Sequence, residues 1–176
     1  MTDADRLDLM WRGGQVTRYH TVNLIRRQSV GEHTYGVMVM LNLLTGFSVS
    51  PGLYEAALLH DVPEAETGDV PSPTKRAMAS QGWDDFELKV LGRYGLGRPL
   101  LTPEEKRLLA LADMLEGLRY TVQEVRMGNL ELVPVMDRFA RYIMELAPFG
   151  HTEERLVEHV MDMRLDVFST PRKESR

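Results

Sequence analysis

Apolar residues recur at every third or fourth position along almost the whole chain, and this spacing predicts an all-α protein. No segment combines β-branched residues with strict apolar-polar alternation for long enough to predict a strand. The pattern predicts helices at Asp3–Arg12, Glu32–Leu44, Pro51–Glu66, Pro73–Ala79, Trp83–Tyr94, Pro103–Met127, Leu132–Leu146 and Thr152–Phe168, with a short turn around Arg18–Ile25. We therefore expect a single-domain helical bundle.

Two helix starts have a recognisable physical cause in the sequence. In Ser50-Pro51 and Thr102-Pro103 a hydroxyl can accept from free backbone amides, and the proline suits the first helical position. Glu105, three residues after Thr102, completes a capping box. Because no repeat or linker interrupts the pattern, we expect one domain over residues 1–168, followed by a polar tail over residues 169–176.

Composition narrows the chemistry that this bundle can carry. The chain has 176 residues, 43% hydrophobic and 27% charged, which suits one globular core. It has no cysteine, so a bound metal must be held by imidazole and carboxylate groups. The net charge of −5 disfavours polymeric nucleic acid but allows a small phosphate-bearing ligand at a local cluster of cations. With neither a signal-like start nor a long apolar segment, we expect a cytoplasmic protein with no membrane partner.

The segment from His60 to Pro71 holds the densest group of reactive side chains. At helical spacing His60, Asp61 and Glu64 would share one flank of the predicted helix, so they could converge on one ion. Pro63 conflicts with a regular helix, and such a conflict is more tolerable where a helix bends or ends at a site. The glycine and prolines that follow predict a turn that brings Asp69 back over the helix end.

Two further polar residues stand among apolar ones on other predicted helices. His33 lies early in the helix Glu32–Leu44, and Asp113 lies in a leucine-rich stretch where an ionised carboxylate is costly without a cation or donors. Taken alone, His33 is explained by a core role and Asp113 by a buried hydrogen-bond acceptor. Together with His60-Asp61, they indicate a site with two imidazoles and two carboxylates for one divalent metal ion.

The order His33, His60-Asp61, Asp113 resembles the H…HD…D signature of the HD-domain phosphohydrolases. The segment around it, with Glu64, Gly68, Asp69 and Pro71, is similar to the YfbR-like 5'-deoxynucleotidase branch and to the DatZ-like dATP triphosphohydrolases of phages. The resemblance covers residues 18–127 and implies an HD-domain helical fold. It also implies a metal-dependent enzyme that cleaves the 5' phosphoester of small 2'-deoxynucleotides.

The resemblance implies a role for each side chain at the metal. His33, His60, Asp61 and Asp113 would hold one divalent ion, for which zinc, cobalt or manganese is expected. Glu64 matches the catalytic carboxylate that orients or deprotonates the attacking water.

For the substrate, the resemblance implies four more residues. Asp69 matches a catalytic carboxylate at the sugar or leaving oxygen, and Arg18 and Lys75 match basic residues that contact phosphate. Tyr19 stands where the family usually has a tryptophan that packs on the deoxyribose and leaves no space for a 2'-hydroxyl. This departure bears on how strictly the chain selects deoxynucleotides.

The sequence allows alternatives for the reaction products and for the assembly. Release of triphosphate is favoured by the short chain, and release of phosphate from a monophosphate is the close alternative. Two other readings are a non-catalytic HD module that binds nucleotide, and an enzyme that cleaves a signalling nucleotide. Eleven methionines, several in the last two predicted helices, suit core packing or the interface of a homo-oligomer, a dimer or hexamer. If a phage encodes the chain, its location is the host cytoplasm.

Overall fold

Helices account for all the regular structure in the computed structural model, which describes residues 2–78 and 80–168. The α-helices are α1 (Asp3–Gln15), α2 (Val30–Leu44), α3 (Pro51–Leu59), α4 (Ser72–Ala77), α5 (Ser80–Arg93), α6 (Pro103–Arg126), α7 (Val133–Glu145) and α8 (His151–Leu165). Three short 3₁₀ helices are η1 (Val62–Ala65), η2 (Leu130–Leu132) and η3 (Asp166–Phe168). The described residues form no strand, which confirms the all-α prediction.

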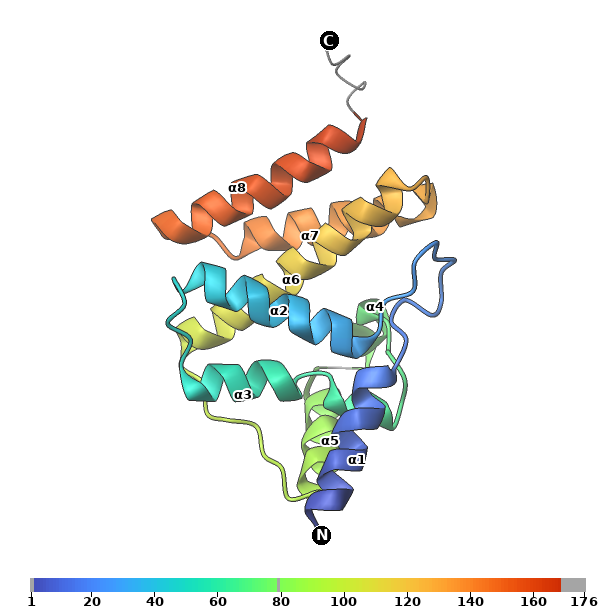
Figure 1. The fold of residues 1–176 in the computed structure, drawn as a ribbon, viewed down its shortest axis with the longest axis vertical. Coiled ribbons are helices and arrows are strands. Elements are labelled where there is room, and N and C mark those ends of the chain that lie inside the picture. The colour runs from blue at the N-terminus through green and yellow to red at the C-terminus, as the bar shows by residue number, and fades with distance from the viewer. Residues whose placement is uncertain (1, 79, 169–176) are drawn as a thin grey trace.

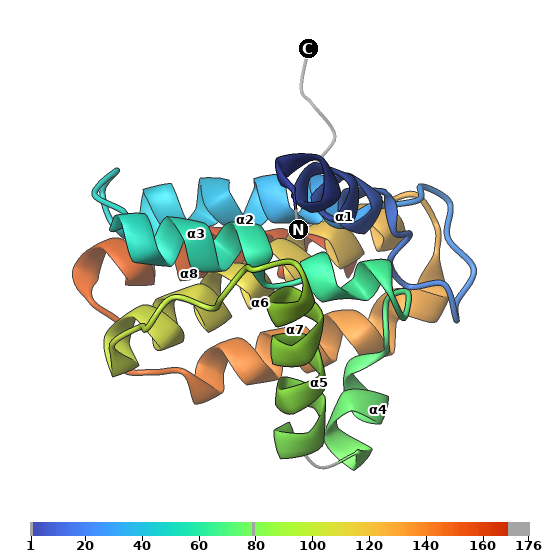
Figure 2. The same cartoon turned by 90° about the horizontal axis from the view of Figure 1, so that it is seen from below.

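The long helix α6 runs through the middle of the molecule and packs against α2, α7 and α8 (Figure 1). Helices α7 and α8 lie at one end, and α1 and α5 lie at the other (Figure 1). Seen from below, α4 and α5 project from the body of the bundle (Figure 2). None of the helices built from the described residues is long and apolar enough to cross a membrane.

Two apolar cores hold these elements together. The larger core joins α2, α3, α6, α7 and α8 around fully buried residues such as Leu41, Leu115 and Ile143. The smaller core joins α1, α3, η1 and α5 through residues that include Leu9, Leu59 and Leu91. Because the end of α3 touches both cores, packing on two sides fixes the backbone that leads into His60.

The predicted caps of α3 and α6 are confirmed. Ser50 Oγ accepts from the amide of Leu53 at 3.2 Å, and proline follows it at the first helical position. Thr102 and Glu105 form a reciprocal capping box at the start of α6.

The prediction of one helix over Pro51–Glu66 is wrong. Helix α3 ends at Leu59, and after a turn the chain forms the 3₁₀ helix η1. Pro63 explains the break, because it lacks an amide donor and its ring would crowd the carbonyl of Leu59, four residues earlier. The other predicted helices occur with ends shifted by a few residues, whereas Ala79 and the tail over 169–176 lie outside the described residues.

Candidate functional site

Side chains from α2 and from the turn after α3 meet in a group that could hold a metal ion. Donor atoms of His33, His60 and Asp61 all lie within 4.8 Å of one another. The two imidazole Nε2 atoms are 3.2 Å apart, and His60 Nε2 lies 3.3 Å from an Asp61 carboxylate oxygen. The end of α3 therefore brings His60 and Asp61 to His33 without the regular helix that the sequence predicted.

Asp113 extends this group from α6. Its Oδ1 lies 3.1 Å from Nε2 of His33, which is itself completely buried. Burial raises the pKa of Asp113, but the hydrogen bond and charge of His33 outweigh burial and hold the pKa well below its ordinary value. The carboxylate is therefore ionised at neutral pH. The four predicted ligands come from α2, from the turn after α3 and from α6, and His33 contacts the other three.

The orientation of the two imidazoles suits a cation. Nδ1 of His60 faces the carbonyl oxygen of Ala57 at 2.6 Å, and Nδ1 of His33 faces a Glu116 carboxylate oxygen at 2.5 Å. Because these partners only accept, both Nδ1 atoms carry the hydrogens. Nε2 of His33 then points to the carboxylates of Asp61 and Asp113, and Nε2 of His60 points to that of Asp61. A proton on one Nε2 atom can make a hydrogen bond with only some of these groups. A divalent cation can bind both Nε2 atoms and both carboxylates. The donor set therefore fits a metal ion.

The charges around His33 support the same reading. Burial and the nearby Arg18 lower the pKa of His33, but the hydrogen bonds with Asp113 and Glu116 outweigh them and raise it to about 9. Positive charge is thus favoured at the point where the carboxylates converge.

Glu64 is not in the group formed by His33, His60 and Asp61, and its side chain pairs with a lysine. Its side chain is 1% exposed, and Oε1 accepts a hydrogen bond from Lys75 Nζ at 2.9 Å. The other oxygen, Oε2, is buried and has no hydrogen-bond partner among the described residues. Burial, followed by the charge of Asp61, raises the pKa of Glu64 to about 8 despite Lys75. A carboxyl group with a pKa near neutrality can accept and return a proton.

The turn after η1 joins the loop before α2 through Asp69. Gly68 adopts a positive φ of 71°, which glycine allows without steric cost, and the chain turns there. An Asp69 oxygen then accepts from the backbone amide of Tyr19 at 2.6 Å. Tyr19 itself has a φ of 55°, and its ring stacks on that of Tyr120 with the centroids 5.2 Å apart. The predicted substrate residues Asp69 and Tyr19 are therefore in contact, although they are 50 positions apart in the sequence.

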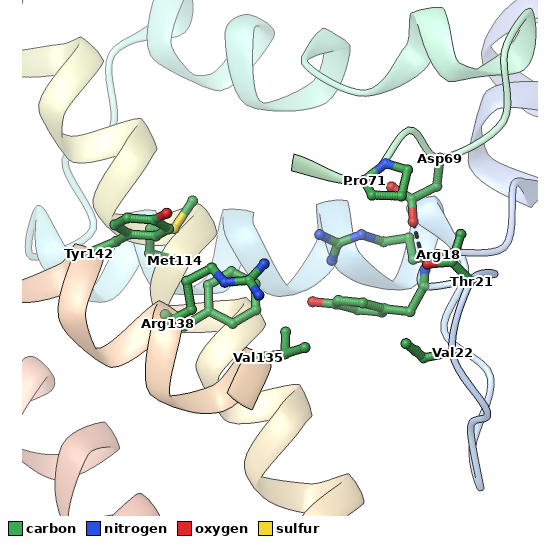
Figure 3. A pocket seen from close by; sticks show the side chains of 11 residues that line it. Arg18, Thr21, Val22, Asp69, Pro71, Met114, Val135, Arg138 and Tyr142 are labelled. Atoms are coloured by element: carbon green, nitrogen blue, oxygen red, sulfur yellow. Dashed lines mark hydrogen bonds between the residues drawn. The ribbon is translucent and has the colours of Figure 1, made fainter. Parts of the chain in front are cut away.

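A cavity of about 270 Å³ opens beside these residues. Figure 3 shows Arg18, Asp69 and Pro71 on one side of it, and Met114, Val135, Arg138 and Tyr142 on the other. Phe139 also lines it. The volume is close to the lower end of the range for small-molecule sites, roughly 300–1,000 Å³. Three predicted substrate residues, Arg18, Tyr19 and Asp69, therefore share one concave site, whereas Lys75 is with Glu64.

Several residues at the site were missed by the sequence prediction. Arg138, Phe139 and Tyr142 lie on α7, whose pattern resembles that of any amphipathic helix. Tyr142 lies four positions after Arg138 and three after Phe139, so it neighbours both on the helix surface, but nothing in the sequence ties that surface to the predicted metal ligands. Glu116 could have been predicted, because it stands in the same apolar stretch as Asp113. A carboxylate buried there is costly without a cation or hydrogen-bond donors.

Comparison with known proteins agrees with this geometry. Residues 15–154 match the model of the HD domain family. The chain belongs to the HD domain family.

Individual relatives come from phages and bacteria. A dATP triphosphohydrolase of Salmonella phage PMBT28 is 32% identical, with 80% of this chain and 79% of the relative covered. The fold is similar to that of the HD phosphohydrolase DatZ of cyanophage S-2L, solved with dA and one catalytic Zn²⁺ ion. The TM-score is 0.64 at 18% identity, over 90% of this chain and 96% of DatZ. An HD-domain phosphohydrolase from Listeria innocua gives a TM-score of 0.71 at 21% identity, over 93% of this chain and 90% of that one.

Proposed function

We propose that this protein is a metal-dependent phosphohydrolase that cleaves the 5' phosphoester of 2'-deoxynucleotides. The specific activity that we propose is that of a dATP triphosphohydrolase, which releases deoxyadenosine and triphosphate. The close alternative is an enzyme that releases phosphate from a deoxynucleoside monophosphate. One observation carries the proposal: His33, His60 and Asp61 converge within 4.8 Å, and Asp113 lies 3.1 Å from His33. The phage relative named dATP triphosphohydrolase, and DatZ with its bound dA, support the choice of substrate.

The proposed metal ligands are His33, His60, Asp61 and Asp113. Two neutral imidazoles and two carboxylates suit zinc, cobalt or manganese. The catalytic Zn²⁺ of DatZ makes zinc the first choice. When bound, a divalent ion supplies Lewis acidity that activates water and polarises a phosphoryl oxygen.

The remaining chemistry falls to charged side chains around the proposed metal ligands. Water adds to the α-phosphorus while the bond from phosphorus to the 5' oxygen breaks, and the leaving oxygen gains a proton. Glu64 orients the water and accepts its proton as the general base. Lys75, bound to Glu64 at 2.9 Å, and the buried Arg18 offset charge on the phosphates. Asp69 acts near the sugar and the leaving oxygen.

The cavity is the proposed site of the nucleoside. Aromatic and aliphatic side chains of α6 and α7 line one side, which suits a flat base, and Arg138 provides a polar group there. We assign Tyr19 to the deoxyribose, because it lines the cavity and its amide donates to Asp69. Its stacking on Tyr120 would hold the ring in place against a 2'-hydroxyl.

A panel of nucleotides tests this proposal. Purified protein is incubated with Zn²⁺, Co²⁺ or Mn²⁺ and with the deoxy and ribo forms of adenosine mono- and triphosphate and guanosine triphosphate. We expect metal-dependent turnover of dATP to deoxyadenosine and triphosphate, and slower turnover of ATP. Release of phosphate from dAMP alone would assign the monophosphatase alternative. Tight binding of dATP without turnover under any metal would overturn the enzymatic proposal.

We also propose that the protein forms a homo-oligomer, a dimer or a hexamer. Tyr35, Val39, Leu43 and Phe47 follow one another at four-residue spacing along and just after α2, and all four are exposed. A row of exposed apolar side chains supports association with another chain. A solution mass equal to that of one chain at micromolar concentration would contradict this assignment.

A further inference from the structure

A buried glutamate on α6 contacts the candidate metal centre without belonging to the proposed ligands. Glu116 is 4% exposed, and its Oε2 lies 2.5 Å from Nδ1 of His33. That nitrogen is on the opposite side of the ring from Nε2, which faces Asp113 and His60. Glu116 therefore contacts a proposed ligand from behind.

The hydrogen bonds around Glu116 have only one possible direction. Arg18, which can only donate, donates to Oε1 of Gln28 at 3.1 Å. The Gln28 amide must then turn its Nε2 to Glu116, and it donates to Oε1 at 2.6 Å. Arg18 also lies 3.4 Å from Glu116 Oε2. With donors facing both of its oxygens, Glu116 acts as an acceptor, and Nδ1 of His33 carries the hydrogen between them.

We propose that Glu116, oriented by Gln28 and Arg18, is a positioning residue that fixes His33 in the tautomer whose Nε2 is free to bind the metal ion. The inference rests on the proposed function, since it assumes that His33 is a ligand. A carboxylate behind a ligating histidine fixes the ring and raises its basicity, and loss of such a partner costs about 10–100-fold in metal affinity.

Gly36 on α2 independently supports a role for the position of the Glu116 side chain. A Cβ atom added at Gly36 would lie 2.5 Å from Cγ of Glu116 and 3.1 Å from its Oε1. A glycine inside a helix weakens that helix relative to alanine. Its presence here leaves the space that the Glu116 side chain occupies behind His33.

The first test is Glu116→Gln, measured by Co²⁺ titration followed through visible absorption. The amide at position 116 can turn its NH₂ to Gln28, where two donors then face each other. If the NH₂ faces His33 instead, Nδ1 must accept a hydrogen bond, so the ring hydrogen lies on Nε2. That hydrogen blocks metal binding at Nε2. We expect Co²⁺ affinity to fall about 10–100-fold. The matched control is Glu124→Gln, because Glu124 is another buried glutamate of α6 but binds the backbone amides of Ile25 and Arg26. Its Co²⁺ affinity should be unchanged.

A double variant tests the direction of the hydrogen bonds. In Gln28→Glu with Glu116→Gln, a carboxylate at position 28 accepts from Arg18 and from the new amide NH₂. The amide oxygen then faces Nδ1 of His33, as the carboxylate did before. We expect the double variant to recover at least part of the Co²⁺ affinity lost in Glu116→Gln. Affinity no better than that of Glu116→Gln would overturn the proposed direction.

Gly36→Ala tests the same role while Glu116 stays in place. The added methyl group displaces the Glu116 side chain, so Co²⁺ affinity should fall, although alanine is the better helix former. The control is Gly92→Ala on α5, where an added Cβ meets nothing within 4 Å. If Glu116→Gln and Gly36→Ala both bind Co²⁺ like the wild type, the inference is wrong. A wild-type protein that binds no Co²⁺ would overturn the proposed function as well.

Discussion

The candidate metal centre and the neighbouring cavity are organised in different ways. At the metal centre, hydrogen bonds from the protein fix each imidazole: Ala57 holds His60, and Glu116 holds His33. Among the residues assigned to substrate and water, two buried polar atoms have no hydrogen-bond partner in the described structure, Tyr19 Oη and Glu64 Oε2. Contacts within the protein orient the two imidazoles of the proposed metal ligands, whereas two groups assigned to substrate and water each have a buried atom with no hydrogen-bond partner among the described residues. Variants of the two regions should therefore fail in different ways.

The largest effect is expected at the metal centre, from His60→Ala. This variant removes one of two imidazoles and should lose stoichiometric metal together with turnover, by about 1,000-fold or more. A loss of several kcal/mol in transition-state stabilisation corresponds to that factor. Metal content by mass spectrometry and turnover of dATP measure it. The exposed His151 gives the control His151→Ala, which should keep both properties. Stoichiometric zinc of unaltered affinity in His60→Ala would remove this residue from the ligands.

Glu64→Gln should separate chemistry from metal binding. The amide oxygen can still accept from Lys75, so the fold is kept, but the group can no longer take a proton. We expect kcat to fall about 100–10,000-fold, the usual contribution of a general base, while metal content stays that of the wild type. Glu66→Gln changes an exposed carboxylate two positions away and should leave kcat unchanged. Wild-type turnover in Glu64→Gln would exclude Glu64 as the base.

The convergence of His33, His60-Asp61 and Asp113 was predictable because its signal is local and chemical. A histidine and an aspartate in apolar helices, together with an adjacent His-Asp pair, are unusual enough to indicate one ion. The helix geometry behind that prediction was wrong at Pro63, which ends α3 early. The predicted shared flank of His60, Asp61 and Glu64 relied on that helix, and Glu64, which follows the proline, is not in the group. His60 and Asp61 lie before the proline and do converge with His33.

The partners of these side chains were not predictable from spacing. Glu116 meets His33 across 83 positions and Gln28 across 88, so only the packing of α2 on α6 brings them together. The face of α7 that lines the cavity was missed for the same reason, since its pattern indicates only an amphipathic helix. The sequence thus identifies polar side chains whose burial is costly. Which residues they contact can be seen only in the folded structure.

The smallest effect is expected from Tyr19→Phe, which changes one buried atom. The hydroxyl has no hydrogen-bond partner in the part of the chain that the structure describes, so its removal should raise the free energy of unfolding by about 1 kcal/mol. If the ring selects deoxyribose, as proposed, the ratio of kcat/KM for dATP over ATP should change by less than about threefold, or ~0.6 kcal/mol. Thermal unfolding and the two kinetic constants measure these effects.

Tyr19→Ala, which also removes the ring that stacks on Tyr120, is the matched comparison and should lower the same ratio much further. A strong loss of discrimination in Tyr19→Phe would assign selection to the hydroxyl instead of the ring. In that case the hydroxyl, which is unpaired in the free protein, gains its partner from the substrate. The cavity and the candidate metal centre would then share one property. In each, polar atoms that lack a partner in the free protein would gain one from the bound group.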